Sequence, residues 1–325
     1  MAMNFRACSL ATALALPLTA AAQQPAATEY PSKPIRVVVG AVAGGPFDFI
    51  TRTLGRSLQN SVTFVLDNRG GAGGAVATDI VVKSPADGYT MLVTSSSHAS
   101  LPVTTRNLTF DAVKDLAPIT MIATSVGFLF VVHPSSPARN VQQFIAAAKA
   151  QPGKLSFGSA GVGNVMHFAA EMFNSMADTR TNHVPYKGVA QVLPDLVAGR
   201  IDFTFGPPTT ILPFVKADKL RALGITAMTR WAELPEVPTI NEQGVKGYVY
   251  LPWYGYWFPA GTPRPIVNRM RNEMAKALED PEVRKAFAEQ GFVPVGSTPD
   301  EFARTIVSEI ELNRSLAAKI GLKPE

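Results

Sequence analysis

The sequence of 325 residues has very little cysteine, and its single thiol, Cys8, lies near the start of the chain. Arg6 is the only charged residue among the first 28, and it precedes an Ala- and Leu-rich run at 7–18. A basic start, a short apolar run and the small residues up to Ala22 are typical of a cleaved secretory signal peptide. The run is shorter than the roughly 20 residues that a membrane-spanning helix needs. The mature chain then has no thiol for a disulfide, a nucleophile or a metal.

Histidine is sparse as well. The four histidines form no HExxH motif and no His/Cys cluster, so the sequence gives little support to a metal site. The formal net charge is +5 and becomes +4 when Arg6 leaves with the signal peptide, and the remaining lysines and arginines are scattered. This mild excess is compatible with an acidic small molecule, and it does not mark a nucleic-acid binder.

Short runs rich in Val, Ile and Phe alternate with longer amphipathic stretches. On one helical face lie Ile50, Leu54 and Leu58, for example. The expected strands are 35–39, 63–66, 90–94, 127–132, 155–158, 201–205 and 220–225. This alternation predicts an α/β protein with mostly parallel sheets covered by helices on both faces.

Two segments are expected to cross between domains, 124–128 and the aromatic stretch 251–259. After the second crossing we expect two helices, 266–278 and 299–318, and no further strong strand. A chain that leaves one domain, builds another and returns gives two lobes with a cleft between them. We therefore predict a signal peptide at 1–22, a first domain at 30–125 plus 256–325, and a second domain at 126–255.

Four loops rich in glycine and serine follow expected strands and lead into expected helices, at 41–48, 68–76, 94–98 and 158–164. In open α/β sheets, ligands bind beyond the carboxyl ends of the strands, where helix N-termini present N–H groups. Ser95, Ser96, Ser97 and Ser159 add hydroxyl donors. Such loops suit a carboxylate, phosphate or sulfate, although each glycine taken alone is also an ordinary turn residue.

A nucleotide phosphate is the less favoured anion. The 41–48 loop lacks the lysine and hydroxyl of a P-loop and the GxGxxG spacing, and no acidic residue is placed after the 68–76 loop to bind a ribose. We expect a carboxylate held mainly by neutral donors, because N–H groups already bind a charged acceptor strongly. Asp48, in the first turn of a helix, is expected to cap N–H groups and hold water.

An exported hydrolase is the alternative that the residues leave open. Ser159 lies in FGSAG, which lacks the first glycine of the G-x-S-x-G elbow. A triad of Ser159 with His98 or His167 is still conceivable, because triads are defined by geometry and not by chain order. His167 lies on an apolar helical face, which favours packing or capping. Tyr186 and Lys187, in a loop before a helix, either lie in solvent or close over an acid.

Six segments resemble, in order and spacing, the Bug-type solute receptors of tripartite tricarboxylate transporters. They are YPSKPIRVVVGAVAGGPFDFITR, DNRGGAGGAVATDIVVKSPADGYTML, FDAVKDLAPIT, HVPYKG, LPEVPTINEQG and PAGTP, and the likeness spans about residues 30–322. The resemblance implies a periplasmic protein of two-lobed Venus-flytrap fold, each lobe a sheet flanked by helices. It would bind a small carboxylic acid and deliver it to separately encoded membrane subunits. We expect a monomer that is not an enzyme and uses no cofactor, metal or nucleic acid.

In that family the loops matching 41–48, 95–98 and 159–164 hold one carboxylate, partly through ordered waters. The ligand-binding residues that the resemblance implies, with two histidines added as candidates, are Val42, Gly45, Phe47, Asp48, Ser96, His98, Ser159, Gly161, Asn164, His167, Tyr186, Lys187 and Gly206. Phe47 departs from the small or polar residue usual there. Unless its ring points into the core, we expect a ligand with an aromatic or aliphatic body rather than citrate. A hydrolase or lyase, or a receptor for a membrane sensor, remains the alternative.

Overall fold

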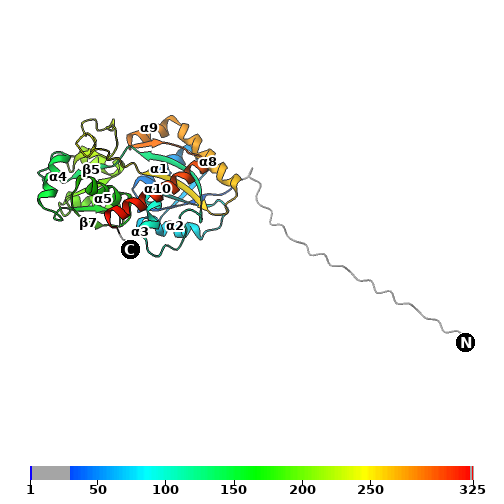
Figure 1. Cartoon of the computed structure of the whole chain (residues 1–325). Helices are drawn as coiled ribbons and strands as arrows, with labels where there is room; N and C mark the ends of the chain where they lie inside the picture. Colours follow the sequence, from blue (N-terminus) through cyan, green and yellow to red (C-terminus); the bar gives the residue numbers. More distant parts are fainter. Residues whose placement is uncertain (2–29, 323, 325) are drawn as a thin grey trace.

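The computed structural model describes residues 30–322, together with residues 1 and 324. The expected signal peptide, Met1 apart, therefore lies outside the described residues. Two β-sheets, each flanked by helices, form two lobes that lie side by side (Figure 1). Within the part of the chain that the structure describes, no helix has the length and apolar character needed to cross a membrane. The predicted fold class, a two-lobed α/β protein, is confirmed.

The first lobe is built on a six-stranded sheet in the order β11-β4-β10-β3-β1-β2. Its strands are β1 (Ile35–Val39), β2 (Phe64–Asn68), β3 (Thr90–Ser95), β4 (Leu116–Ser125), β10 (Trp253–Pro259) and β11 (Phe292–Pro294). Its helices are α1 (Pro46–Ser57), η1 (Ala72–Gly74), α2 (Ala75–Val82), η2 (Ser96–Ser100), α3 (Leu101–Thr104), α8 (Arg264–Glu279), α9 (Pro281–Glu289) and α10 (Pro299–Ile320).

The second lobe is built on a five-stranded sheet in the order β7-β6-β8-β5-β9. Its strands are β5 (Leu129–Val132), β6 (Ser156–Ser159), β7 (Asn182–Pro185), β8 (Phe203–Gly206) and β9 (Arg221–Ile225). Its helices are α4 (Val141–Ala150), α5 (Val165–Ala177), α6 (Val189–Val197) and α7 (Pro208–Lys216). Its core is aromatic: the ring of Phe130 stacks on Phe205 with 4.6 Å between centroids and meets Phe144 and Phe203 edge-on.

Strand direction differs from the prediction of mostly parallel sheets. The parallel pairs are β1 with β2 and β3, and β6 with β7 and β8. In contrast, β10 runs antiparallel to β3 and β4, and β5 runs antiparallel to β8 and β9. The strands β5 and β10 each enter their sheet from the other lobe and not through a helix of their own lobe. They are therefore not bound to the parallel direction that a helical crossover gives. The structure also adds β4, β7, β11 and α9, which the sequence did not predict.

Helix α10 touches both lobes. It packs on β4 and η2 of the first lobe and also on α5 of the second lobe, and Figure 1 shows it in red running towards α5. Thr298 begins it with a capping box, in which its hydroxyl accepts from the Glu301 N–H while the Glu301 carboxylate accepts from the Thr298 N–H. The lobe boundaries at 30–125, 126–255 and 256–325 stay a prediction.

Candidate ligand-binding cleft between the lobes

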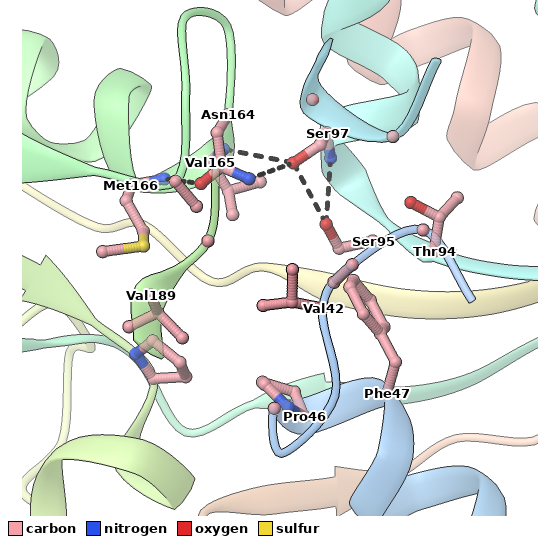
Figure 2. Close-up of a pocket in the computed structure, with 18 of the residues that line it drawn as sticks. Val42, Pro46, Phe47, Thr94, Ser95, Ser97, Asn164, Val165, Met166 and Val189 are labelled. Atoms are coloured by element: carbon pink, nitrogen blue, oxygen red, sulfur yellow. Dashed lines mark hydrogen bonds between the residues drawn. The ribbon is translucent and has the colours of Figure 1, made fainter. Parts of the chain in front are cut away.

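A cavity lies between the two lobes, beyond the carboxyl ends of β1, β3, β6 and β8 (Figure 2). Its empty volume is about 720 Å³, part of which is open to solvent. The first lobe contributes residues 40–47 and the end of β3. The second lobe contributes the start of α5, the 187–190 segment and Pro207. This is the place that the topology of an open α/β sheet favours for a ligand.

The loop between β1 and α1 is held by Asp48. Its two carboxylate oxygens accept hydrogen bonds from the Gly44 N–H at 2.7 Å and the Asn68 amide at 2.8 Å. Gly45, at the N-cap, has no side chain to cap α1, and Pro46 follows it. The early N–H groups of α1 therefore lack a side-chain cap, and the positive end of the helix is presented at the cavity. Asp48 itself does not line the cavity.

Ser97 joins the two lobes at the cavity wall. Its Oγ accepts hydrogen bonds from the Asn164 amide and the Val165 N–H, both at 3.2 Å, and from the Ser95 hydroxyl at 3.1 Å (Figure 2). A hydroxyl has two acceptor lone pairs and one proton to donate. Three donors thus converge on two lone pairs, so the Ser97 oxygen has no capacity to accept from a ligand as well, and its O–H proton is the group left for one.

The start of α5 is the second helix N-terminus at the cavity. Asn164 is its N-cap, and its side-chain oxygen accepts from the Met166 N–H at 2.9 Å. The preceding turn is fixed from both lobes: the Gly163 N–H donates to His167 Nδ1 at 3.1 Å, and the Ser100 hydroxyl donates to the Gly163 carbonyl. Gly163 has φ +72°, a conformation that favours glycine. The turn can therefore approach α3 closely.

Ser159 and two histidines form a buried network behind this turn. The Ser159 hydroxyl donates to the Gly161 carbonyl at 3.0 Å, so the Nε2–H of His183, 2.6 Å from the same oxygen, is the donor to it. His183 stacks on His167 with 3.9 Å between ring centroids. Burial lowers the pKa of His183 to about 4. Burial, and then the charge of His183, lower that of His167 to about 3. Both rings are neutral at pH 7, and Ser159 is arranged as a structural hydroxyl.

Three further candidates, His98, Tyr186 and Gly206, do not line the cavity. His98 is fully buried, and its Nε2–H donates to the Ala112 carbonyl at 2.7 Å; burial lowers its pKa to about 4. The Tyr186 hydroxyl donates to Asp195 at 2.7 Å. Gly206 packs against Ile211, where a Cβ would meet the side chain at 2.6 Å. A serine triad of Ser159 with His98 would need atoms from opposite lobes that do not meet here.

The thirteen expected residues thus fall into two groups. Lining the cavity are Val42, Gly45, Phe47, Asn164 and Lys187. Away from it are Asp48, Ser96, His98, Ser159, Gly161, His167, Tyr186 and Gly206. The sequence did not single out several residues that do line it: Thr94, Phe128, Met166, Val189 and Tyr254. Ser97 was expected only as one of four loop hydroxyls, together with Ser95, Ser96 and Ser159.

The cavity combines few polar groups with apolar walls. Thr94, Ser95, Ser97, Asn164 and Tyr254 supply the neutral hydrogen-bonding side chains, and among the described lining residues only Lys187 carries a charge. The walls are formed by Val42, Phe47, Phe128, Met166 and Val189. Phe47 both lines the cavity and packs into the core, edge-on to Tyr254 at 5.8 Å between centroids. Across the described chain, no cluster of three or more His, Cys, Asp or Glu is placed to hold a metal.

Comparisons with known proteins agree with this geometry. The family model described as the tripartite tricarboxylate transporter family receptor matches residues 50–322. A protein of the UPF0065 group from Pseudomonas sp. (strain P51) is 37% identical, over 90% of this chain and 88% of its own length. Protein BugT of Bordetella pertussis is 34% identical, over 91% and 92%. The R. palustris protein Rpa4515, solved with adipate, superposes with a TM-score of 0.87 at 32% identity, over 91% of this chain and all of its own.

Proposed function

The chain belongs to the family of tripartite tricarboxylate transporter receptors, and on this premise we propose that it captures a small carboxylic acid in the periplasm. It then delivers the acid, chemically unchanged, to membrane subunits encoded separately. The observation that carries this proposal is the meeting of two helix N-termini, those of α1 and α5, at one cavity between the lobes. Such N-termini attract an anion through their N–H groups and the helix dipole.

The polar groups of the cavity favour binding over catalysis. Ser159 is fully buried and its proton is directed at the Gly161 carbonyl, so it is not poised to attack a substrate. His167 is buried and His183 half-buried behind the turn, and neither lines the cavity. No paired nucleophile and base among the described residues lines the cavity. The cavity offers donors for a carboxylate and no group that would transform it.

We further propose that the ligand has an aliphatic or aromatic body. Beyond the donors at the two helix N-termini, the walls are the hydrocarbon and aromatic side chains of Val42, Phe47, Phe128, Met166 and Val189. Each methylene buried against such walls contributes about 0.8 kcal/mol. A compact, triply charged citrate would leave two further carboxylates facing these walls, at a large desolvation cost. The relative solved with adipate supports an acid with an apolar body.

Calorimetric titration of the mature protein with adipate, benzoate and citrate tests the proposal. We expect saturable binding of adipate or benzoate, much weaker binding of citrate, and recovery of the bound acid intact by chromatography. Consumption of the acid would show an enzyme, and tight binding of citrate alone would refute the apolar body. Cell fractionation should place the chain in the periplasm, and loss of uptake when its gene is deleted would distinguish a transport receptor from a sensor.

A matched pair of lysine variants tests whether neutral donors dominate. Lys187 is exposed at the cavity rim, and Lys154 is exposed elsewhere in the second lobe. A solvated charge contributes up to about 1 kcal/mol, so Lys187→Gln should weaken binding no more than about fivefold. Lys154→Gln should leave it unchanged. Abolished binding in Lys187→Gln would show that an ion pair, and not the loop amides, holds the acid.

A further inference from the structure

A second cavity lies between α5, α10 and the segment that leads into β10. Its empty volume is about 1010 Å³, part of which is open to solvent. Two neighbouring serines of η2 line different cavities: Ser97 lines the ligand cleft, and Ser96 lines the second cavity. Since η2 and α10 belong to the first lobe and α5 to the second, the second cavity, like the first, has walls from both lobes.

Two deeply buried polar side chains line this cavity without a hydrogen-bond partner in the described protein. Ser96 is 3% exposed and Asn313 is 6% exposed, and no described residue bonds to either side chain. The cavity is partly open to solvent, so water reaches their polar atoms, and both side chains present unused hydrogen-bonding groups to the cavity. These groups are available either to ordered water or to a ligand that can form hydrogen bonds.

A carboxylate and a phenol complete the polar part of the second cavity. Glu309 lies one helical turn before Asn313 on α10, and no described residue forms an ion pair or hydrogen bond with its carboxylate. Burial raises the pKa of Glu309, as expected for a carboxylate without a cation beside it. The phenol is that of Tyr250, which lines the same cavity as Glu309; burial, and then the charge of Glu309, raise its pKa.

The walls of the second cavity are largely apolar, with Ser175 of α5 and Ser315 of α10 among the hydrocarbon side chains. Met172 and Met176 of α5 face Leu312 and Leu316 of α10 across it. Methionine side chains adapt readily to the shape of an alkyl chain. Among the described residues that line the cavity, only Lys319 is cationic; it lies ten residues beyond Glu309 on α10, about 15 Å along the helix, so its charge is screened from the Glu309 end. The cavity thus has an acceptor-rich acidic end and a hydrocarbon slot.

We propose that this second cavity binds a small aliphatic primary amine, with its ammonium group at Glu309 and Asn313 and its alkyl chain between α5 and α10. An ammonium group has three N–H donors and no acceptor. The side-chain acceptors that line the cavity are the Glu309 carboxylate, the Asn313 side-chain oxygen, and the hydroxyls of Ser96, Tyr250, Ser175 and Ser315. A charge-assisted bond to the carboxylate supplies the strongest contact. The inference stands apart from the proposed function, since it concerns other residues and a ligand of opposite charge.

Titration with hexylammonium chloride at pH 7.5, and with 1-hexanol as the uncharged match, tests this site. We expect saturable binding of hexylammonium and at least tenfold weaker binding of hexanol. Glu309→Gln should weaken hexylammonium binding at least tenfold, and Asn313→Ala should weaken it also. Glu311→Gln is the matched control, because Glu311 lies on the same helix but is exposed and pairs with Arg314. Hexylammonium binding to this variant should be unchanged.

Three results would overturn the proposal. The first is that hexylammonium binds no better than hexanol, and the second is that it binds equally to Glu309→Gln and Glu311→Gln. The third is a structure of crystals grown with hexylammonium in which ordered water alone fills the second cavity. Thermal unfolding of each variant verifies that it is folded, and Ser96→Ala provides an independent variant on η2 should a change in α10 disturb packing. Binding of carboxylic acids to the first cavity is measured separately in the same variants, and it should persist.

Discussion

Replacement of Ser97 by alanine tests how much the hydrogen bonds between the lobes contribute to ligand affinity. In the structure, Ser97 Oγ accepts from the Asn164 amide and the Val165 N–H of the other lobe. Both bonds exist only when the lobes are together. Each is expected to contribute a net 0.5 to 1.5 kcal/mol, so the closed state should lose about 1 to 3 kcal/mol. Since ligand binding draws on the closed state, the measured affinity should fall about 5- to 150-fold.

Calorimetry gives the affinity, and small-angle X-ray scattering gives the compaction on adding ligand. The matched control is Ser96→Ala, which removes a hydroxyl from the adjacent residue without removing any bond between the lobes. In a double-mutant cycle, Asn164→Ala combined with Ser97→Ala should cost less than the sum of the two single changes, because they share one hydrogen bond. Unchanged affinity and unchanged compaction in Ser97→Ala would refute the reasoning, and strict additivity would assign Ser97 a role toward the ligand alone.

Three further changes have defined outcomes. Asp48→Ala leaves the Gly44 N–H and the Asn68 amide unpaired, so calorimetry should show weaker ligand binding while circular dichroism stays native; an unchanged dissociation constant would contradict the role of Asp48. Phe47→Ser should lower affinity for acids with an apolar body more than for malate, and a uniform loss would mean that Phe47 acts only through the core. Because burial holds the pKa of His167 near 3 and of His98 and His183 near 4, against about 6.5 when unfolded, these histidines should add no pH dependence to the free energy of unfolding above pH 7. That free energy should then fall between pH 6.5 and 4, by at most about 1.4 kcal/mol per pH unit and histidine; urea titrations at pH 7.5, 5.5 and 4.5 should show this decline, which a flat profile would exclude.

The elements that the sequence predicted well are those with a strong local pattern. The strand β1 reads as a continuous apolar run because it is buried between β2 and β3, and the sequence pattern placed it at the observed residues. The strand β7 was not predicted because its residues are only partly buried and include Asn182 and His183. The strand β10 lies in the aromatic stretch 251–259, which the sequence predicted as a crossing between the domains and not among the expected strands of a sheet. In the structure Gly255 is needed there, because Phe302 packs 2.1 Å from where its Cβ would lie.

The site was predictable as a set of loops, but not as a set of side chains. A strand, a glycine turn and a helix start are visible in sequence, and these bring 41–48 and 158–164 to one cavity. The direction of each side chain in η2 depends on packing against distant residues. His98 turns towards the Ala112 carbonyl, Ser97 towards Asn164, and Ser96 towards α10. None of these partners is near in sequence, so local patterns carry no information about them.

The arrangement of the two helix N-termini gives a physical reason for closure to depend on an acid. Each terminus carries roughly half a positive charge, and Gly45 of α1 and Asn164 of α5 both line the cavity. Asp48, in the first turn of α1, offsets the charge of that terminus, so closure brings to the ligand chiefly the N–H groups of the two helix starts. A carboxylate between them can accept hydrogen bonds from both. The hydrogen bonds between Ser97 and α5 favour the closed state whether or not a ligand is bound. The acid therefore has to supply only the rest of the free energy that closure needs. A neutral ester of the same acid should bind weakly and produce little compaction, because its oxygens accept weaker hydrogen bonds from the two helix starts than a carboxylate does.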